Sequence, residues 1–168
     1  MQPLLERLMT TFPDAVRGVE VDTARNEITA RVAAARIVDV ARWLHDTPEA
    51  SFDHITDICS VDYPNDPERF EVVYQLLSLA HRRRIRLKAR VTEDAPQIAS
   101  VTGIWKGAEF MEREVYDLMG ITFVGHPDLR RILLPEDYEE GHPLRKDFPT
   151  EGRGWRSSFP FIPRLDEA

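Results

Sequence analysis

The fold is decided by two consecutive stretches, Phe70-Glu71-Val72-Val73-Tyr74-Gln75-Leu76-Leu77 and Arg84-Ile85-Arg86-Leu87-Lys88-Ala89-Arg90-Val91. In each stretch a large or apolar side chain occupies every second position, which is the pattern of a β-strand with one buried face. Residues 78–83 between them are short enough for a hairpin connection. The stretches therefore predict two neighbouring antiparallel strands, with a row of cations opposite the apolar face of the second.

The residues before this pair predict two helices and three more strands. A stripe of Leu4, Leu8 and Phe12 is typical of a short amphipathic helix, which Pro13 ends. The elements expected here are, in chain order, a helix over residues 3–12, two strands within 16–32, a helix over 37–44 and a mixed strand within 52–63. The whole order indicates an α+β fold, in which a largely antiparallel sheet packs with helices.

Residues 104–119 carry the clearest helical pattern in the chain. Their apolar side chains fall within one arc of about 100° around the helix axis. Gly120 follows them, in the position where a helix usually ends. The spacing predicts a helix over the whole of residues 104–119.

The charges of this helix allow two interpretations. Glu112 and Glu114 border the apolar arc on opposite sides, and Arg113 lies across from it, one turn from Glu109 and from Asp117. The charges can pair with one another on an exposed face, or they can meet a second surface where desolvation makes them matter more. Because Glu112 and Glu114 diverge, they are poorly placed to act together on one substrate as a catalytic acid and base.

Composition excludes several classes of site. The chain has 168 residues, and 29 acidic against 22 basic side chains give a net charge of −7. Its single cysteine, Cys59, excludes an intramolecular disulfide and any site built from several cysteines, such as an iron–sulfur cluster. The five histidines lack zinc-type spacing, and no Gly-rich phosphate loop indicates a nucleotide. We expect a soluble chain without a secretory signal or membrane-spanning helix.

The last quarter of the chain differs from the rest. Six of the 12 prolines fall after residue 121, so long regular elements are not expected there. We expect an α/β domain over residues 1–124 and an extended arm over residues 125–168. The aromatic side chains of this arm favour a segment that lies on a partner subunit, and an arm that wraps its own domain is the alternative.

Two similar turns mark this arm. Gly125-His126-Pro127 is followed by Leu129, Arg130 and Arg131, and Gly141-His142-Pro143 is followed by Leu144, Arg145 and Lys146. Each turn presents a leucine and two cations. The repetition favours docking against an acidic or carbonyl-rich surface.

At these residues the chain resembles a known family. Glu112-Arg113-Glu114-Val115-Tyr116-Asp117-Leu118-Met119-Gly120-Ile121, followed by His126, Arg130, Ile132 and Leu133, is similar to the signature of the C-type subunit of the proton-translocating NADH–quinone oxidoreductase, which is the 30 kDa subunit of respiratory complex I. Further similarity lies in residues 57–63, 69–74 and 141–149. Glu109 departs from the asparagine or aspartate usual in the family, and the tail after Pro149 is short.

The resemblance implies a non-catalytic scaffold subunit in the peripheral arm of this complex. It implies contact with a hydrogenase-like large subunit of the D type and with the B-type subunit that holds the terminal cluster. It also implies a peripheral position at the cytoplasmic face of the cell inner membrane, with FMN and iron–sulfur clusters on other subunits and none on this chain. The expected interface residues are Glu112, Arg113, Glu114, Asp117, Gly120, His126, Arg130, His142, Arg145 and Lys146.

Two alternatives remain open. The same kind of subunit occurs in membrane-bound hydrogenases and in dehydrogenases that use donors other than NADH. More remotely, Arg84, Arg86, Lys88 and Arg90 on one strand face could follow the phosphates of a nucleic acid. The overall acidity of the chain, and the lack of aromatic side chains among these four cations, argue against nucleic acid as a partner.

Overall fold

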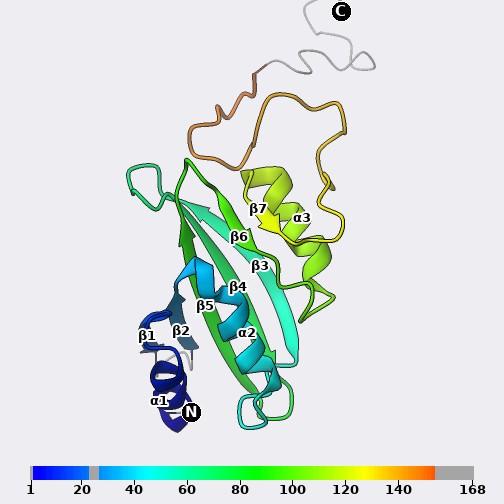
Figure 1. Ribbon diagram of the computed structural model, residues 1–168. Helices are drawn as coiled ribbons and strands as arrows, with labels where there is room; N and C mark the ends of the chain where they lie inside the picture. Colours follow the sequence, from blue (N-terminus) through cyan, green and yellow to red (C-terminus); the bar gives the residue numbers. More distant parts are fainter. Residues whose placement is uncertain (1, 23–26, 154–168) are drawn as a thin grey trace, which may run out of the picture.

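The computed structural model describes residues 2–22 and 27–153 (Figure 1). The aromatic tail expected to dock on a partner, residues 155–162, lies outside this part of the chain. The helices are α1 (Gln2–Thr11), α2 (Ile37–Asp46) and α3 (Ala108–Met119), with a short 3₁₀ turn over Ala34–Arg36. The strands are β1 (Val16–Asp22), β2 (Glu27–Val32), β3 (His54–Asp62), β4 (Phe70–Ser78), β5 (Arg83–Val91), β6 (Gln97–Ala99) and β7 (Thr122–Val124).

A five-stranded sheet in the order β1-β2-β5-β4-β3 forms the centre of the molecule. The β1–β2 hairpin and the β3–β4–β5 meander are antiparallel, and the two units join where β2 runs parallel to β5. The predicted pairing of residues 70–77 with residues 84–91 is confirmed, since Phe70 lies opposite Val91 and Leu77 opposite Arg84. The expected α+β class with a largely antiparallel sheet is therefore confirmed.

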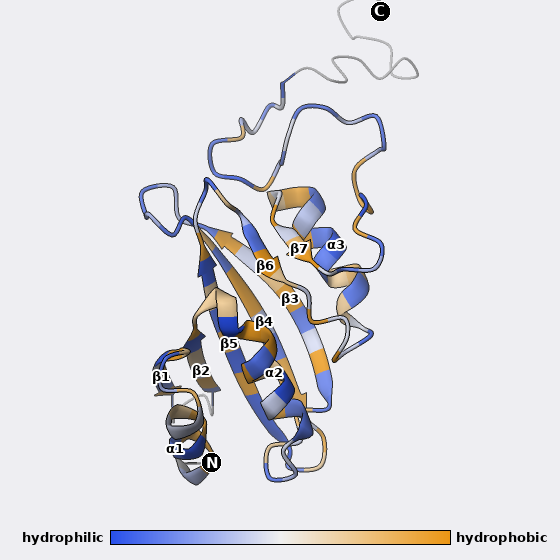
Figure 2. Ribbon diagram, in the orientation of Figure 1, coloured by the Kyte–Doolittle hydropathy of each residue, from blue (hydrophilic) through white to orange (hydrophobic). Residues whose placement is uncertain are grey.

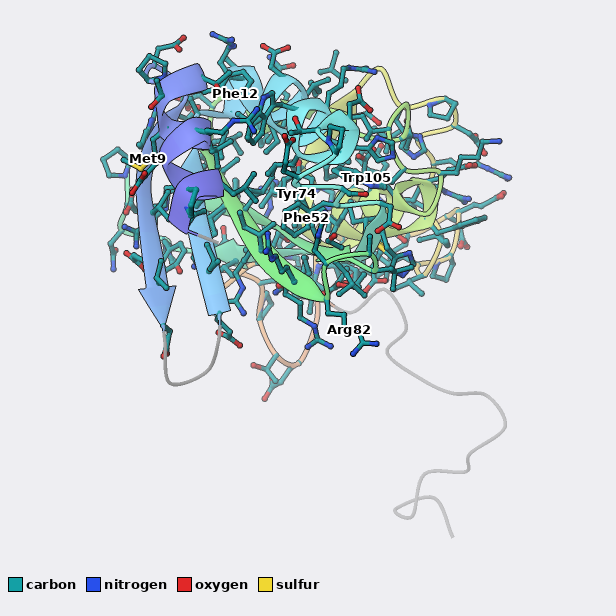
Figure 3. The ribbon with its side chains drawn as sticks, turned by 90° about the horizontal axis from the view of Figure 1, so that it is seen from below. Met9, Phe12, Phe52, Tyr74, Arg82 and Trp105 are labelled. Atoms are coloured by element: carbon teal, nitrogen blue, oxygen red, sulfur yellow. The ribbon has the colours of Figure 1, made fainter. Side chains whose placement is uncertain are left out.

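The alternating strands fold as they do because their apolar face is covered by helices. Phe70, Val72, Tyr74 and Leu76 of β4, and the alternate residues of β5 beginning at Ile85, are buried in one hydrophobic cluster with side chains of α1, α2 and α3. Figure 3 labels Phe52, Tyr74 and Trp105 in this interior, where the Trp105 indole donates a hydrogen bond to the Phe52 carbonyl at 3.0 Å. The opposite face of the sheet carries charged side chains instead.

The helix expected over residues 104–119 begins four residues later than predicted. Residues 101–107 form consecutive turns, in which the Trp105 amide donates to the Val101 carbonyl at 3.0 Å. Gly103 and Gly107 lower the helical propensity of this stretch. The turns lead from β6 into α3, and β7 follows α3 to form with β6 a short parallel pair that the sequence did not predict.

Beyond β7 the described part of the arm, residues 125–153, has turns and bends but no helix or strand. Figure 1 shows it running past α3 and then back above the end of this helix. The arm contacts its own domain at several points, which are described below. That the arm also lies on a partner subunit stays a prediction. No helix in the described ranges is long and apolar enough to cross a membrane.

Candidate functional site

The arm closes the carboxyl end of α3. The last four carbonyls of a helix have no partner within the helix. Here the Gly120 amide binds the Tyr116 carbonyl at 2.9 Å, and three arm groups bind the carbonyls that follow. These groups are the His142 ring (Nδ1 to Asp117 O, 3.0 Å), the Leu144 amide (to Leu118 O, 3.1 Å) and the Arg145 guanidinium (Nε to Met119 O, 2.8 Å). The second His-Pro turn thus docks on carbonyls, as expected, but they belong to its own helix.

Asp117 holds the first pass of the arm. Its side chain is fully buried, and its Oδ2 atom accepts hydrogen bonds from three successive amides, those of Ile132, Leu133 and Leu134, at 2.8–3.0 Å. Its Oδ1 atom accepts a hydrogen bond from Arg131 at 2.8 Å. Desolvation acts to raise the pKa of this carboxyl, but the amides and Arg131 outweigh it and keep the pKa below its usual value.

Gly120 is required by both conformation and space. Its φ of +73° lies in the left-handed region that glycine adopts without strain. A Cβ atom here would lie 2.4 Å from Nε2 of His142, and 2.6 Å from a guanidinium nitrogen of Arg145. The absence of a side chain therefore lets the second pass of the arm approach the helix end.

Arg113 is buried by its own chain rather than exposed. Its guanidinium donates to the carbonyls of Arg130 and Arg131, at 3.1 and 3.0 Å, and lies over the Phe110 ring. The prediction that Arg113 can pair with Glu109 or Asp117 is wrong, since neither pair forms among the described residues. Asp117 instead binds arm amides and Arg131. The interpretation of α3 as an exposed helix with ion pairs along it is wrong for the same reason.

Glu112 ties α3 to the turn after β6. Its two carboxylate oxygens accept hydrogen bonds from the Ser100 hydroxyl at 2.6 Å and from the Val101 amide at 2.8 Å. Burial raises the pKa of Glu112, and these hydrogen bonds oppose that shift only in part. Desolvation and the nearby Glu112 charge also raise the pKa of Tyr74, whose buried hydroxyl has no hydrogen-bond partner among the described residues. Glu114 is exposed, so the two glutamates diverge as predicted.

The first His-Pro turn contacts the start of α3. The His126 Nδ1 atom accepts a hydrogen bond from the Asp128 amide at 3.0 Å, so the ring donates through Nε2 to the Glu109 carbonyl at 2.9 Å. The Arg130 side chain is exposed and pairs with Asp128 at 2.9 Å. The two histidine turns therefore bracket α3, one at each end.

A buried charge cluster fastens the far part of the arm to the sheet. Arg69 donates to both oxygens of the buried Asp62, at 2.7 and 2.8 Å, and also binds Asp147 of the arm at 2.9 Å. The Lys146 amide donates to Asp62 at 2.8 Å, while the Lys146 side chain is exposed. Hydrogen bonding from Arg69 lowers the pKa of Asp62, although burial opposes this.

Sequence reasoning did not assign a role to Asp62 or Arg69. Both lie at strand ends, on either side of the loop that contains Pro64 and Pro67. A sequence signal was available for this pair. An acidic and a basic residue lie at the two ends of a short connection between antiparallel strands, where their side chains can face each other. Among the sequence-predicted residues, Glu114 and the side chains of Arg130 and Lys146 face outward rather than into these contacts.

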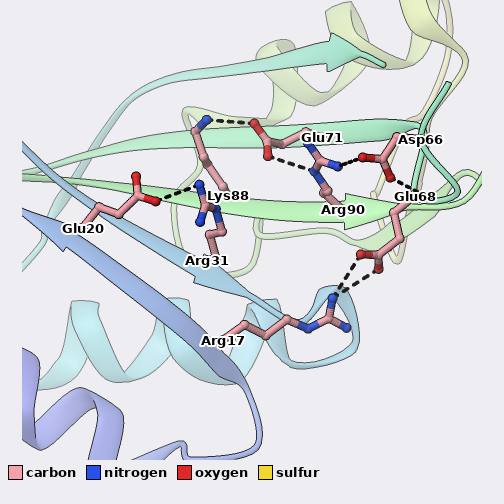
Figure 4. Close-up of polar contacts among 8 residues, drawn as sticks. All are labelled: Arg17, Glu20, Arg31, Asp66, Glu68, Glu71, Lys88 and Arg90. Atoms are coloured by element: carbon pink, nitrogen blue, oxygen red, sulfur yellow. Dashed lines mark hydrogen bonds and ion pairs between the residues drawn. The ribbon is translucent and has the colours of Figure 1, made fainter. Parts of the chain in front are cut away.

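Most cations on the open face of the sheet have carboxylate partners within the chain. Lys88 and Arg90 both bind the buried Glu71, at 2.9 and 3.2 Å, and Arg90 also pairs with Asp66 (Figure 4). The remaining pairs drawn are Arg31 with Glu20 at 2.8 Å and Arg17 with Glu68 at 3.1 Å. Arg86 faces Glu27 at 3.6 Å. This charge balance argues further against the remote alternative that Arg84, Arg86, Lys88 and Arg90 follow the phosphates of a nucleic acid, because three of these four cations already have carboxylate partners.

The described residues include no group of three or more His, Cys, Asp or Glu side chains that could hold a metal ion. The buried polar groups of the α3–arm junction are directed at backbone groups of the same chain. Such an arrangement fixes the path of a loop, and it places no nucleophile beside a base.

Comparisons with known proteins agree with the resemblance. Residues 30–154 match the family model described as respiratory-chain NADH dehydrogenase, 30 Kd subunit. The chain is 51% identical over 146 residues to the C-type subunit of the NADH-quinone oxidoreductase of Roseiflexus sp. (strain RS-1), covering 87% of this chain and 82% of that protein. It is 50% identical over 152 residues to the corresponding protein of Xanthobacter autotrophicus (strain ATCC BAA-1158 / Py2), covering 90% of this chain and 71% of that one.

Two solved structures share the fold. A trypsin-resistant fragment (1-134) of Nqo5 is 32% identical, with a TM-score of 0.63, and the match covers 76% of this chain and 98% of the fragment. A chain of the membrane-bound sulfane sulfur reductase, an archaeal respiratory membrane complex, is 25% identical, with a TM-score of 0.75 and coverage of 89% and 85%. Because the family model matches residues 30–154, which are most of this chain, the chain belongs to the 30 kDa subunit family of respiratory-chain NADH dehydrogenase.

Proposed function

We propose that this chain is a non-catalytic structural subunit of the peripheral arm of an NADH–quinone oxidoreductase. The observation that carries the proposal is the family match over residues 30–154 together with the construction of the α3–arm junction. In that junction the signature residues Glu112, Arg113 and Asp117 all bind groups of their own chain. They shape a surface rather than act on a substrate.

The finer features of this function belong to the same proposal. The chain would contact a D-type hydrogenase-like subunit and a B-type cluster subunit, and through them lie peripherally at the cytoplasmic face of the inner membrane. FMN and the iron–sulfur clusters would be carried by those and other subunits, which transfer electrons from NADH to quinone and couple this to proton translocation. The chain itself would bind no cofactor and no nucleic acid.

The test is to purify the complex through a tag on this chain from cells that make all the subunits. We expect co-purification of a flavin- and cluster-containing particle that oxidises NADH and reduces quinone. The same chain expressed alone should be colourless and inactive. Stoichiometric flavin or iron in the isolated chain, or recovery of the tagged chain free of any larger particle, would contradict the proposal.

The electron donor needs a separate measurement, because a similar fold occurs in the archaeal sulfane sulfur reductase complex. The purified particle should reduce quinone with NADH. A particle that contains this chain but lacks a flavin subunit, and that does not oxidise NADH, would instead support the related non-NADH assembly.

A further inference from the structure

One end of the open sheet face differs from the rest. Towards the carboxyl end of β5, Lys88 and Arg90 share the buried carboxylate of Glu71. Arg84 and Arg86 lie on the same face of the same strand, close to the turn from β4, and share no such acid. Figure 2 shows hydrophilic and hydrophobic residues mixed along β5, because these four cations alternate with apolar residues that enter the core. The strand therefore has one paired half and one half whose cationic groups are still available.

The side chains at this end have few acceptors. Arg84 is exposed, and its side chain has no hydrogen bond or ion pair with another residue of the described ranges. Arg86 lies 3.6 Å from an oxygen of Glu27 and donates to Gln75 Oε1 at 3.4 Å, so both of its contacts are long. Because Gln75 accepts through its side-chain oxygen, its NH2 group is left to donate. Three groups of donors thus lack a close acceptor within this part of the chain.

These donors line one hollow of about 380 Å³ on the open face. Gln75 lies directly opposite Arg86 in the β4–β5 ladder. A β-bulge interrupts β3 at the same level, and the Thr56 hydroxyl within it donates to the Gln75 carbonyl at 3.0 Å. The polar side chains that line the hollow come from four neighbouring strands and are those of Glu27, Thr56, Gln75, Arg84 and Arg86. The available donors therefore face one space and do not form separate patches.

The chemistry of this hollow suits a carboxylate. A guanidinium group binds an oxyanion through two parallel hydrogen bonds. The two arginines and Glu27 leave the hollow a single positive charge, which one carboxylate balances and a doubly charged phosphate would exceed. Glu27 would also repel a continuous anionic surface, such as a nucleic-acid backbone or the headgroups of an acidic membrane.

We propose that this hollow, which we name the β5 anion site, receives an aspartate or glutamate side chain from a neighbouring protein subunit. The presence of such a neighbour rests on the proposed function. A bound carboxylate would supply Arg84, Arg86 and Gln75 with the acceptor that Glu71 gives to the other half of β5. The site lies on the sheet face opposite the helices, so this contact is separate from those of α3 and the arm.

The test is a competition in cells that make the whole complex. Wild-type and variant full chains carry different tags, and their ratio in the purified particle is compared with their ratio in the lysate. Arg84→Gln/Arg86→Gln removes the cations of the site, and Arg84→Glu reverses one of them. Arg42→Gln is the matched control, because Arg42 is exposed on α2 and has no ion pair among the described residues. Thermal unfolding of the isolated chains should match the wild type, since the contacts that are lost are long or exposed.

We expect roughly ten-fold less of the double variant than of the wild type in the particle, because the carboxylate of the partner would become buried without its cations. Arg84→Glu should be reduced at least as much, and Arg42→Gln should enter as well as the wild type. Equal incorporation of the double variant and the wild type overturns the proposal, as does an equal loss in the control. If the wild-type chain enters no complex at all, the proposed function fails and this inference falls with it.

Measurements on the isolated full chain decide between ligands. In an NMR titration with a hexaglutamate peptide, we expect the Nε–H signals of Arg84 and Arg86 to shift in the wild type, and we expect Arg84→Gln/Arg86→Gln to lose binding. Tighter binding of inorganic phosphate than of the peptide at these signals would overturn the proposal in favour of a free anion. Sedimentation with anionic vesicles, or retention of duplex DNA, that the double variant abolishes would overturn it in favour of a membrane or a nucleic acid. We expect neither.

Discussion

The α3–arm junction and the open face of the sheet are built from the same residue types but use them differently. At the junction, Asp117, Arg113 and Glu112 are buried and bind mainly backbone groups of segments distant in sequence. On the sheet face, pairs such as Arg31–Glu20 are exposed and join one side chain to another. A buried charge that satisfies backbone groups fixes the path of a chain, whereas an exposed pair contributes little free energy.

This comparison implies a gradient of mutational effects. Changes at the junction should destabilise the chain strongly, since they leave polar groups buried without partners. Changes to the exposed ion pairs of the open face, such as Arg31–Glu20, should have small effects, which salt reduces further.

The largest effect is expected for Asp117→Ala. The change leaves the amides of Ile132, Leu133 and Leu134 without their acceptor, and we expect a loss of about 3–5 kcal/mol in the free energy of unfolding. Urea denaturation measures the loss, and trypsin cleavage at Arg131 should become faster. The exposed Asp128→Ala is the control and should cost less than about 1 kcal/mol. Equal effects of the two changes would contradict the contrast between the regions.

The next largest effect is expected for Gly120→Ala, which should lower the free energy of unfolding by about 2–4 kcal/mol. The left-handed backbone conformation of residue 120 and crowding by the His142 ring act together there. Two glycines separate these causes. Gly125 has a φ of +88°, but a Cβ atom added there would have no other atom within 4 Å. Gly125→Ala should therefore lose only the free energy that comes from strain in the left-handed backbone. Gly103 has neither feature, and Gly103→Ala should be close to neutral. Thermal or urea unfolding should rank the three in that order.

A smaller and pH-dependent effect is expected for Glu112→Gln. Because burial raises the pKa of Glu112, this carboxyl group stays protonated to higher pH in the folded chain than in the unfolded chain. The free energy of unfolding therefore falls as pH rises from about 4.5, the value for the unfolded chain, through the pKa in the folded chain. The glutamine oxygen can still accept from the Val101 amide, and its NH2 group can donate to the Ser100 hydroxyl oxygen, but the side chain does not titrate. The unfolding free energy of the variant, measured by urea denaturation at several pH values, should therefore fall less than that of the wild type as pH rises from about 4.5 to 7. Glu114→Gln, on the exposed side of the same helix, is the matched control.

The smallest effect is expected on the open face. Arg31→Ala removes the exposed pair with Glu20 and should cost less than about 1 kcal/mol in unfolding free energy. Urea denaturation in low salt and in about 1 M NaCl should show the difference shrinking as salt rises. A loss of several kcal/mol, or one insensitive to salt, would mean that the two regions do not differ as described.

The sheet could be predicted from the sequence because its signal is local. Alternation with a period of two marks the buried face of β4 and β5, and a strand needs only a neighbour of the same kind to pair with. The β6–β7 pair could not be predicted, because three residues are too few to show a period. The start of α3 was missed where Gly103 and Gly107 favour turns over helix.

The candidate site was predicted in its residues but not in its contacts. The signature stretch includes Asp117 and Arg113, and helical spacing alone pairs them with each other. Their actual partners come from residues 130–134, a segment without regular structure that local patterns cannot position. The same limit applies to the cations of β5, whose partners Glu71 and Asp66 lie on other segments.

The parallel pairing of β2 with β5 has a consequence for synthesis of the chain. Residues 29–31 lie beside residues 86–88, so the β1–β2 hairpin emerges from the ribosome well before the strand it needs. Contacts between segments so distant in sequence form slowly compared with the local meander. Until β5 has been made, the inner edge of β2 exposes backbone hydrogen-bonding groups that could pair with another nascent polypeptide. Within this sheet, the amino-terminal hairpin thus waits longest for its partner strand, whereas β3, β4 and β5 pair with strands next to them in sequence.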